Sequence, residues 1–441
     1  MQLLPALAAL CVLPLLISVG ISALRAPLRV LLPIYAALIP FGSGITVPIG
    51  VPPPFNTVTT LAGIAVIVIL AARLLLLGGA RTIHPSVPAW LLFTGFNGVT
   101  FLWSIDRSAT LDRFVILTSL VALYAIVLLV PITREDVERL KTGIVVGATA
   151  ACAYGFVLLL TGRLPEEGAG LPRFATAGGV GDAADPNITA AVLVLPLVLA
   201  VSKTMRAERA LLRMAYAGAT LLIGTGLLLT ASRGGLLGAL VAVVVLVAHE
   251  KRPAVITSSV IAVALVVGAV GFLLAPEQFE RLDKPGSTGR TNIWLVGLIA
   301  CEHYCLTGSG LNTFEDVHRE TALEAAEASG LRLGEPPHNL LLGVGVELGI
   351  LGVVLLLAGL ATTVMPLRRL PKLRRGPPLA AITGLLVANI FLANLHFKYF
   401  WLALMYAAFE AAAIGDERAP DAEHAVAPAP VRRLPRVLEP A

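Results

Sequence analysis

Charged and aromatic residues are both scarce in this chain of 441 residues. Lys, Arg, Asp and Glu together make up 14% of the sequence, whereas a soluble domain carries about 25%. Aromatic residues account for 6% and hydrophobic residues for 57%. This composition excludes an ordinary soluble domain and predicts an integral membrane protein.

Cysteine is rare, and no metal-binding motif is present. Of the four cysteines, Cys11 and Cys152 lie inside apolar runs, so no disulfide framework is implied. The segment 301–305 contains two cysteines and a histidine but lacks a fourth ligand, and residues 301 and 303 would point to different helix faces. DxD and HExxH patterns are also absent. We therefore expect neither a metal nor a cofactor.

Long apolar runs dominate the remainder of the chain. Roughly a dozen runs of about 17–25 residues are each long enough to cross a hydrocarbon core of ~30 Å as a helix. They are continuous rather than alternating, which favours helices over barrel strands. The predicted fold is all-α, a polytopic membrane protein with about 12 transmembrane helices and one long outer loop containing short helices. The candidate spans are 3–24, 28–41, 57–77, 87–104, 110–130, 142–161, 186–202, 211–230, 234–249, 253–275, 339–365, 377–395 and 398–414.

The segment 28–41 is short and flanked by prolines, so a re-entrant conformation is open and the count is 12 or 13. Basic connectors alternate with neutral or acidic ones, and placing the basic set in the cytoplasm is self-consistent. This pattern accounts for the net charge of +5 without nucleic acid. The chain then divides into an N-terminal transmembrane bundle, an outer loop, C-terminal transmembrane helices and a disordered cytoplasmic tail: 1–275, 276–338, 339–414 and 415–441.

Arg233 interrupts one of the longest apolar stretches. As a single helix, residues 211–248 would extend about 57 Å at 1.5 Å per residue, so the chain should turn near Ser232–Gly235. An arginine at that depth is costly without a partner. Two interpretations remain open, a snorkelling or carbonyl-capping arginine and a ligand for an anion at head-group level.

Arg290 follows a Gly/Ser-rich turn and opens a predicted helix over 290–305. Free backbone N–H groups at a helix start attract anions, and the guanidinium fork suits phosphate. The turn is not a P-loop, because GxxxxGK[ST] is absent. An ordinary interfacial arginine is the alternative. A second, acidic helix is predicted over 313–329.

His338 lies where the outer loop meets a span, and an ordinary histidine pKa near 6.5 suits general-base work. Asn339 can orient it or cap the next helix, and a structural histidine is the alternative. Asp185 precedes Pro186 as in an ordinary helix start. Substrate binding by Asp185, Asn187 and the nearby Arg173 is the competing interpretation.

Several of these motifs occur in an order that resembles the O-antigen ligase-like superfamily of bacterial envelope proteins. The resembling elements are Ser232-Arg233-Gly234 at a span break, Gly289-Arg290-x-x-x-Trp294, Leu306-Thr307-Gly308-Ser309-Gly310 followed by Phe314, and Pro337-His338-Asn339 followed by Glu347-Leu348-Gly349-Ile350-Leu351-Gly352. The resemblance runs from about residue 180 to 360, and the first 150 residues are similar only as a polytopic protein.

The resemblance implies a multi-pass glycosyltransferase of the bacterial inner membrane with a periplasmic catalytic loop. Arg233 and Arg290 would engage the diphosphate of a glycan carried on undecaprenyl diphosphate, and His338 would activate the acceptor. The transfer would be metal-independent and inverting. We favour an O-antigen ligase of lipopolysaccharide biosynthesis, with lipid A–core as the acceptor. A polymerase using the same donor is the alternative, and a lipid or glycan transporter is the alternative of another class.

Overall fold

The computed structural model describes residues 22, 24–42, 45–48, 50, 55–78, 83–164, 173–176, 185–251, 267–269, 272–273, 289–324 and 333–423. Within these ranges the chain is helical, apart from turns and one isolated bridge between Thr46 and Thr57. The expected spans 3–24 and 253–275 lie almost wholly outside the described residues. The count of 12 or 13 spans therefore stays a prediction.

The helices follow the expected apolar runs closely. They are α2 (Pro27–Leu38), η1 (Ile39–Phe41), α3 (Val58–Leu77), α4 (Ser86–Val99), η2 (Thr100–Leu102), α5 (Arg107–Leu128), α6 (Arg134–Leu160), α7 (Pro186–Arg206), α8 (Ala210–Leu229), α9 (Arg233–Ala248), α12 (Arg290–Tyr304), α13 (Phe314–Glu324), α14 (Leu340–Val364), η3 (Met365–Arg369), α15 (Lys372–Ala388) and α16 (Lys398–Glu423).

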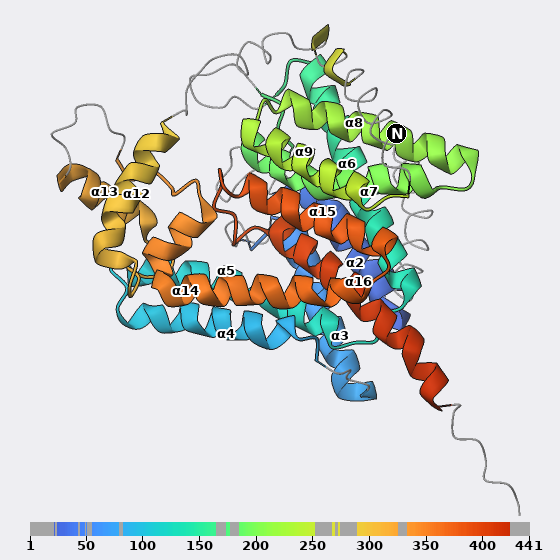
Figure 1. The fold of residues 1–441 in the computed structure, drawn as a ribbon, viewed down its shortest axis with the longest axis horizontal. Coiled ribbons are helices and arrows are strands. Elements are labelled where there is room, and N and C mark those ends of the chain that lie inside the picture. Colours follow the sequence, from blue (N-terminus) through green and yellow to red (C-terminus); the bar gives the residue numbers. More distant parts are fainter. Residues whose placement is uncertain are drawn as a thin grey trace, which may run out of the picture.

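Six of the described helices are long and apolar enough to cross a membrane: α3, α5, α6, α7, α8 and α14. Three apolar stretches are shorter, namely α2 with η1, α4 with η2, and α9. The helical polytopic class is thus confirmed. Figure 1 shows the long helices lying side by side, with α12 and α13 together at one end of the bundle.

Aromatic side chains form part of the core between the helices. The ring of Trp401 on α16 lies 4.9 Å from that of Trp90 on α4 and 5.8 Å from that of Tyr124 on α5, measured between centroids. All three side chains are essentially inaccessible to solvent. Burying such large rings supplies much apolar area, so this aromatic cluster joins α4, α5 and α16.

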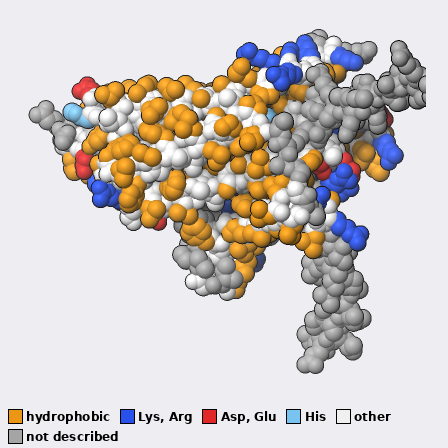
Figure 2. All heavy atoms as spheres, turned by 90° about the horizontal axis from the view of Figure 1, so that it is seen from below, with side chains coloured by type: hydrophobic (Ala, Val, Ile, Leu, Met, Phe, Trp, Pro, Cys, Tyr) orange, Lys and Arg blue, Asp and Glu red, His pale blue; other side chains and the backbone are white. Residues whose placement is uncertain are grey.

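Basic side chains from several helices meet at the end of the bundle away from α12 and α13. The buried carboxylate of Glu410 on α16 pairs with Lys141, and Arg134 and Arg374 approach it at 3.7 and 3.9 Å. Lys203 and Arg206 also make ion pairs there. Figure 2 shows hydrophobic side chains over the middle of one face and most Lys and Arg toward this end. We call it the basic end.

Three helices depart from the predicted spans. The span expected over 377–395 ends at Ala388, and the Asn389 side chain accepts a hydrogen bond from the Asn394 N–H at 3.1 Å, which stabilises a turn over 389–397. The span expected over 339–365 is interrupted at Gly349, whose φ of 67° and ψ of −172° are not helical. In addition, α16 continues to Glu423, beyond the boundary expected at 414.

Candidate active site

The chain turns between α8 and α9, as predicted. Ala231 takes a positive φ of 49°, and the Ser232 side chain then caps α9 by accepting from the Gly235 N–H at 3.3 Å. Arg233 is the first residue of α9 and is exposed. The buried Arg173 donates twice to the Thr230 carbonyl, at 2.9 and 2.6 Å, which satisfies the end of α8.

Arg290 begins α12, directly after Gly289 in the left-handed conformation at φ 83°. Its guanidinium carbon lies 6.0 Å from the centroid of the Phe391 ring. The same phenylalanine packs against Gly234, the residue after Arg233, because a Cβ at Gly234 would lie 2.9 Å from the Cβ of Phe391. The two predicted arginines therefore begin two helices that meet at one aromatic residue of the 389–397 turn.

His338 is held in a backbone conformation that is rare for histidine. Its φ is 43°, and Asn339 then caps α14 by accepting from the Leu342 N–H at 3.0 Å. Upstream, the Glu335 N–H donates to Nδ1 of the buried His318 on α13, at 3.4 Å. The histidine is thus fixed between a cap on one side and α13 on the other.

The break in α14 receives the loop of residues 306–310. Interrupting a helix frees carbonyl groups that must find other donors in an apolar setting. The Ser309 and Gly310 N–H groups bond the carbonyls of Val346 and Glu347 at 3.0 and 2.9 Å. Only glycine fits here, because a Cβ at Gly349 would lie 2.6 Å from the Leu306 carbonyl oxygen. The motif at 306–310 and the motif at 347–352 are therefore in direct contact.

A cavity of about 250 Å³ opens beside this loop, at the end of the bundle opposite the basic end. His338 and Asp185, the N-cap of α7, line it. Asp185 stabilises the charged form of Arg290, and both residues influence the pKa of His338. Arg290 thus lies next to the cavity wall, although neither it nor Arg233 is among the lining residues.

The surroundings of His338 lower the pKa of its imidazole. Burial lowers its pKa most, the Arg290 charge lowers it further, and Glu335 and Asp185 partly offset this. The pKa of Arg290 is also lowered by burial, with Asp185 acting against the shift. A neutral imidazole beside a cavity can accept a proton, and the neighbouring cation can bind an anion without a metal.

The remaining predicted residues take mainly structural contacts. Asp185 accepts from the Asn187 N–H at 2.7 Å, which is the capping role, and it also faces the cavity. The side-chain oxygen of Asn187 lies 3.5 Å from Arg173. Contrary to the prediction from cysteine placement, Cys301 and Cys305 form a disulfide one turn apart at the end of α12. They face each other because residues four apart share a helix face.

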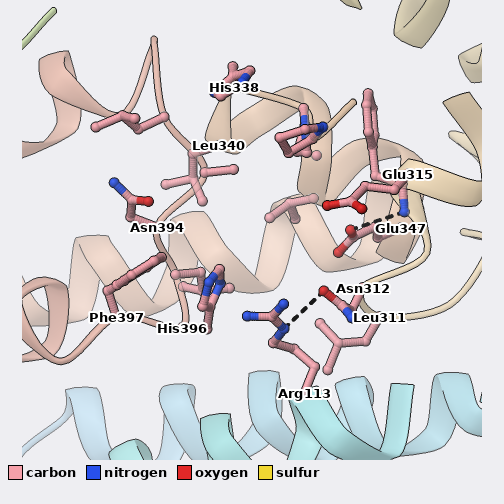
Figure 3. A pocket seen from close by; sticks show the side chains of 18 of the residues that line it. Arg113, Leu311, Asn312, Glu315, His338, Leu340, Glu347, Asn394, His396 and Phe397 are labelled. Carbon is pink, nitrogen blue, oxygen red and sulfur yellow. Dashed lines mark hydrogen bonds between the residues drawn. The ribbon is translucent and has the colours of Figure 1, made fainter. Parts of the chain in front are cut away.

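Further polar residues, for which the sequence predicted no role, also line the cavity. Arg113 on α5 donates through Nε to the Asn312 side-chain oxygen at 2.9 Å. Glu347 on α14 accepts from the Phe314 N–H at 3.3 Å, and Glu315 lies beside it (Figure 3). The signal was present in the sequence, because ionisable residues inside apolar spans mark functional or paired positions.

Non-glycine residues with positive φ gather in this region. Of the residues that the structure describes, only Ala231, Asn312 and His338 have this conformation. Such backbone strain costs of order 1–3 kcal/mol and clusters at active sites and ligand clamps. Ala231 lies two residues before Arg233, Asn312 accepts a hydrogen bond from Arg113, and His338 is the candidate base.

The fold and the cavity define a class of protein: a polytopic helical membrane protein with a polar site at one end of its bundle. Residues 218–357 match the family model described as O-antigen ligase, Wzy_C. This confirms the resemblance to the O-antigen ligase-like superfamily over the matched segment, which runs from α8 into α14. No curated protein matches the chain.

Proposed function

We propose that the protein is an O-antigen ligase, transferring a glycan from undecaprenyl diphosphate to a hydroxyl group of lipid A–core. The observation that carries the proposal is that His338 and Asp185 line one cavity while Arg290, outside the lining, is coupled electrostatically to both. The three come from segments far apart in the chain, and two of them belong to the family segment. The family match supports the coarser class, a membrane glycosyltransferase.

Charge distribution supports an orientation with the cavity in the periplasm of a bacterial inner membrane. The basic end takes the cytoplasmic side under the positive-inside rule. The helices α7 and α14 carry site residues at their starts and basic residues at or just beyond their ends. The Cys301–Cys305 disulfide of α12 also favours an oxidising compartment for the cavity end.

The proposed reaction needs one base and one anion site. His338 removes the proton of the acceptor hydroxyl while its oxygen bonds to the anomeric carbon of the donor. The bond from that carbon to the diphosphate breaks on the opposite face, so configuration inverts. Undecaprenyl diphosphate leaves with its electron pair, and Arg233 and Arg290 neutralise its charge. Attraction between these charges is stronger where water is excluded.

Two alternatives differ in acceptor or in class. A polymerase would use the same donor and extend a glycan on the same type of carrier, so it shares every residue named above. A transporter would place ionisable residues around a central, mid-span cavity. The described cavity lies instead at the start of α7 and α14, which favours the enzyme.

Purified protein in nanodiscs, supplied with a lipid-linked glycan donor, tests the proposal. Arg233→Ala and Arg290→Lys should each lower transfer by about 10²–10³-fold, the range for a lost stabilising donor. Arg139→Lys, an exposed position paired with Glu135 at the basic end, is the matched control. Near-normal turnover of Arg233→Ala would remove that residue from the mechanism.

Two further arms of the same assay separate the alternatives. Offering lipid A–core or a second lipid-linked glycan as the acceptor separates ligase from polymerase. Activity should survive EDTA, because the scheme places no metal on the diphosphate. Loss of turnover with EDTA and recovery with Mg²⁺ or Mn²⁺ would contradict the two-arginine account.

A further inference from the structure

The cavity has a second cationic side, formed by Arg113. Figure 3 shows its guanidinium rising from α5 between His396 and Asn312, across the cavity from His338. The Nε group is bonded to Asn312, whereas among the described residues the guanidinium makes no ion pair. A fork fixed at one nitrogen keeps its outer N–H groups available to a ligand.

The loop that fixes Arg113 is itself anchored on η2 and α5. The Thr110 hydroxyl donates to the Leu311 carbonyl at 2.8 Å, and the Leu311 N–H donates to the Thr100 hydroxyl at 3.3 Å. Asn312 then adopts φ 65°, and its side-chain oxygen accepts the hydrogen bond from Arg113 Nε. Backbone strain at Asn312 is typical of sites where a binding group, here the Arg113 guanidinium, is held in place before the ligand arrives.

Carboxylates share this side of the cavity with Arg113. Both Glu315 and Glu347 line it and both act electrostatically on the arginine, although neither is close enough for an ion pair. Two carboxylates near one guanidinium disfavour an anionic ligand. Together they offer hydrogen-bond donors and acceptors, and hydroxyl groups use both.

We propose that Arg113, Asn312, Glu315, Glu347 and His396 form a subsite for one uncharged, hydroxyl-rich sugar ring of the acceptor. The identification of the ring as acceptor rests on the proposed function. The cavity of about 250 Å³ is small, because ligand pockets run from about 300 Å³ upward, and it suits one ring rather than a chain.

Placement separates this subsite from the diphosphate site. Asp185 and Arg290 act on His338, whereas Arg113 interacts with Glu315, Glu347 and His396. A ring bound over Arg113 lies in the cavity that His338 lines on the opposite side. One of its hydroxyls then faces the base, while the donor approaches from the Arg290 side.

Saturation-transfer NMR on the protein in nanodiscs tests the subsite without any donor. The probes are the methyl glycosides of glucose, galactose and a heptose, with inorganic pyrophosphate as the anionic probe. Wild type should bind at least one glycoside, and Arg113→Ala should weaken it at least about tenfold, as for a lost hydrogen bond from a charged group. Pyrophosphate binding should depend on Arg290 and not on Arg113.

Asn312→Gly is the second variant, because glycine accepts the positive φ while the amide that holds Arg113 is lost. It should also weaken glycoside binding. Arg319→Ala, on the exposed surface of α13 and paired with Asp316, is the control and should bind as wild type does.

Equal glycoside binding by wild type and Arg113→Ala, or no binding of any glycoside by wild type, would overturn the subsite. Loss of pyrophosphate binding in Arg113→Ala would overturn it too, by assigning Arg113 to the donor. Glycoside binding that depends on Arg113 in a protein without transferase activity would overturn the proposed function and leave the subsite standing.

Discussion

The guanidinium of Arg290 lies over the ring of Phe391, with 6.0 Å between the guanidinium carbon and the ring centroid. The same ring lies 6.1 Å from that of Trp294, one turn along α12. Gly234, next to Arg233, packs against the Phe391 side chain from α9. One phenylalanine therefore contacts both helix starts that carry the proposed diphosphate ligands.

Replacing Phe391 with leucine should weaken donor binding by about two- to fivefold, because an exposed cation–π contact contributes ~0.5–1 kcal/mol. Phe391→Tyr keeps the aromatic face and should bind donor as wild type does. Equilibrium binding of a lipid-linked donor measures the effect. A leucine variant with unchanged affinity would show that the ring does not position Arg290.

The pH dependence of transfer should reflect the lowered pKa of His338. A base must be neutral, so activity is present above this pKa and is lost as pH falls through it. Because burial and Arg290 both lower the pKa, the acidic limb should lie below pH 6.5, the ordinary histidine value. An acidic limb of the activity profile at or above pH 6.5 would show that burial and Arg290 do not lower the pKa of His338.

Removing the nearby cation should move the His338 pKa upward, since the protonated imidazole is then no longer repelled. Histidine NMR titration of Arg290→Gln measures this directly, with the signal assigned by its absence in His338→Ala. Arg139→Gln at the basic end is the matched control. A His338 pKa unchanged in Arg290→Gln would place the two residues too far apart to cooperate.

His318 should act as a positioning residue for His338. Its Nδ1 accepts the Glu335 N–H, and burial lowers its pKa, which keeps the ring neutral and able to accept. His318→Leu should lower the transfer rate by up to about 10²-fold, the scale of a small misplacement, with donor affinity unchanged. His318→Asn offers an oxygen near the same place and should recover part of the rate. Equal rates for the two variants would make the role one of packing alone.

Gly349 should tolerate no side chain. Gly349→Ala would place a Cβ 2.6 Å from the Leu306 carbonyl oxygen in a backbone conformation that only glycine adopts readily, at a cost of order 1–3 kcal/mol or more. Gly345→Ala is the control, since its nearest neighbour is the Cys305 Sγ at 3.5 Å. Thermal unfolding in detergent should show a lowered midpoint for the first variant and not for the second.

Local patterns in the sequence predicted the ends of elements well. The turn near Ser232–Gly235 follows from length alone, and Asp185 and Asn339 cap helices as their residue types suggest. The helix predicted over 290–305 is observed as α12. In each case the cause lies within a few residues, so a pattern in the chain is enough.

Features that depend on distant partners were not predictable in this way. The apolar run 377–395 gives no hint that the Asn389 carbonyl, at the end of α15, will accept a hydrogen bond from the Leu340 N–H at 3.0 Å. The break at Gly349 is stable because residues 309–310 reach it from another part of the chain. Arg113 owes its orientation to Asn312, which is 199 residues away in sequence.

The central claim is that His338 acts on the acceptor while the arginines hold the donor. Paired measurements of donor affinity and single-turnover transfer, on wild type and His338→Ala, test it most directly. The account predicts nearly equal donor affinity and a rate lowered by ~10²–10⁴-fold, the usual contribution of a general base. Weakened donor binding with a normal rate at saturation would contradict it and make His338 a binding residue.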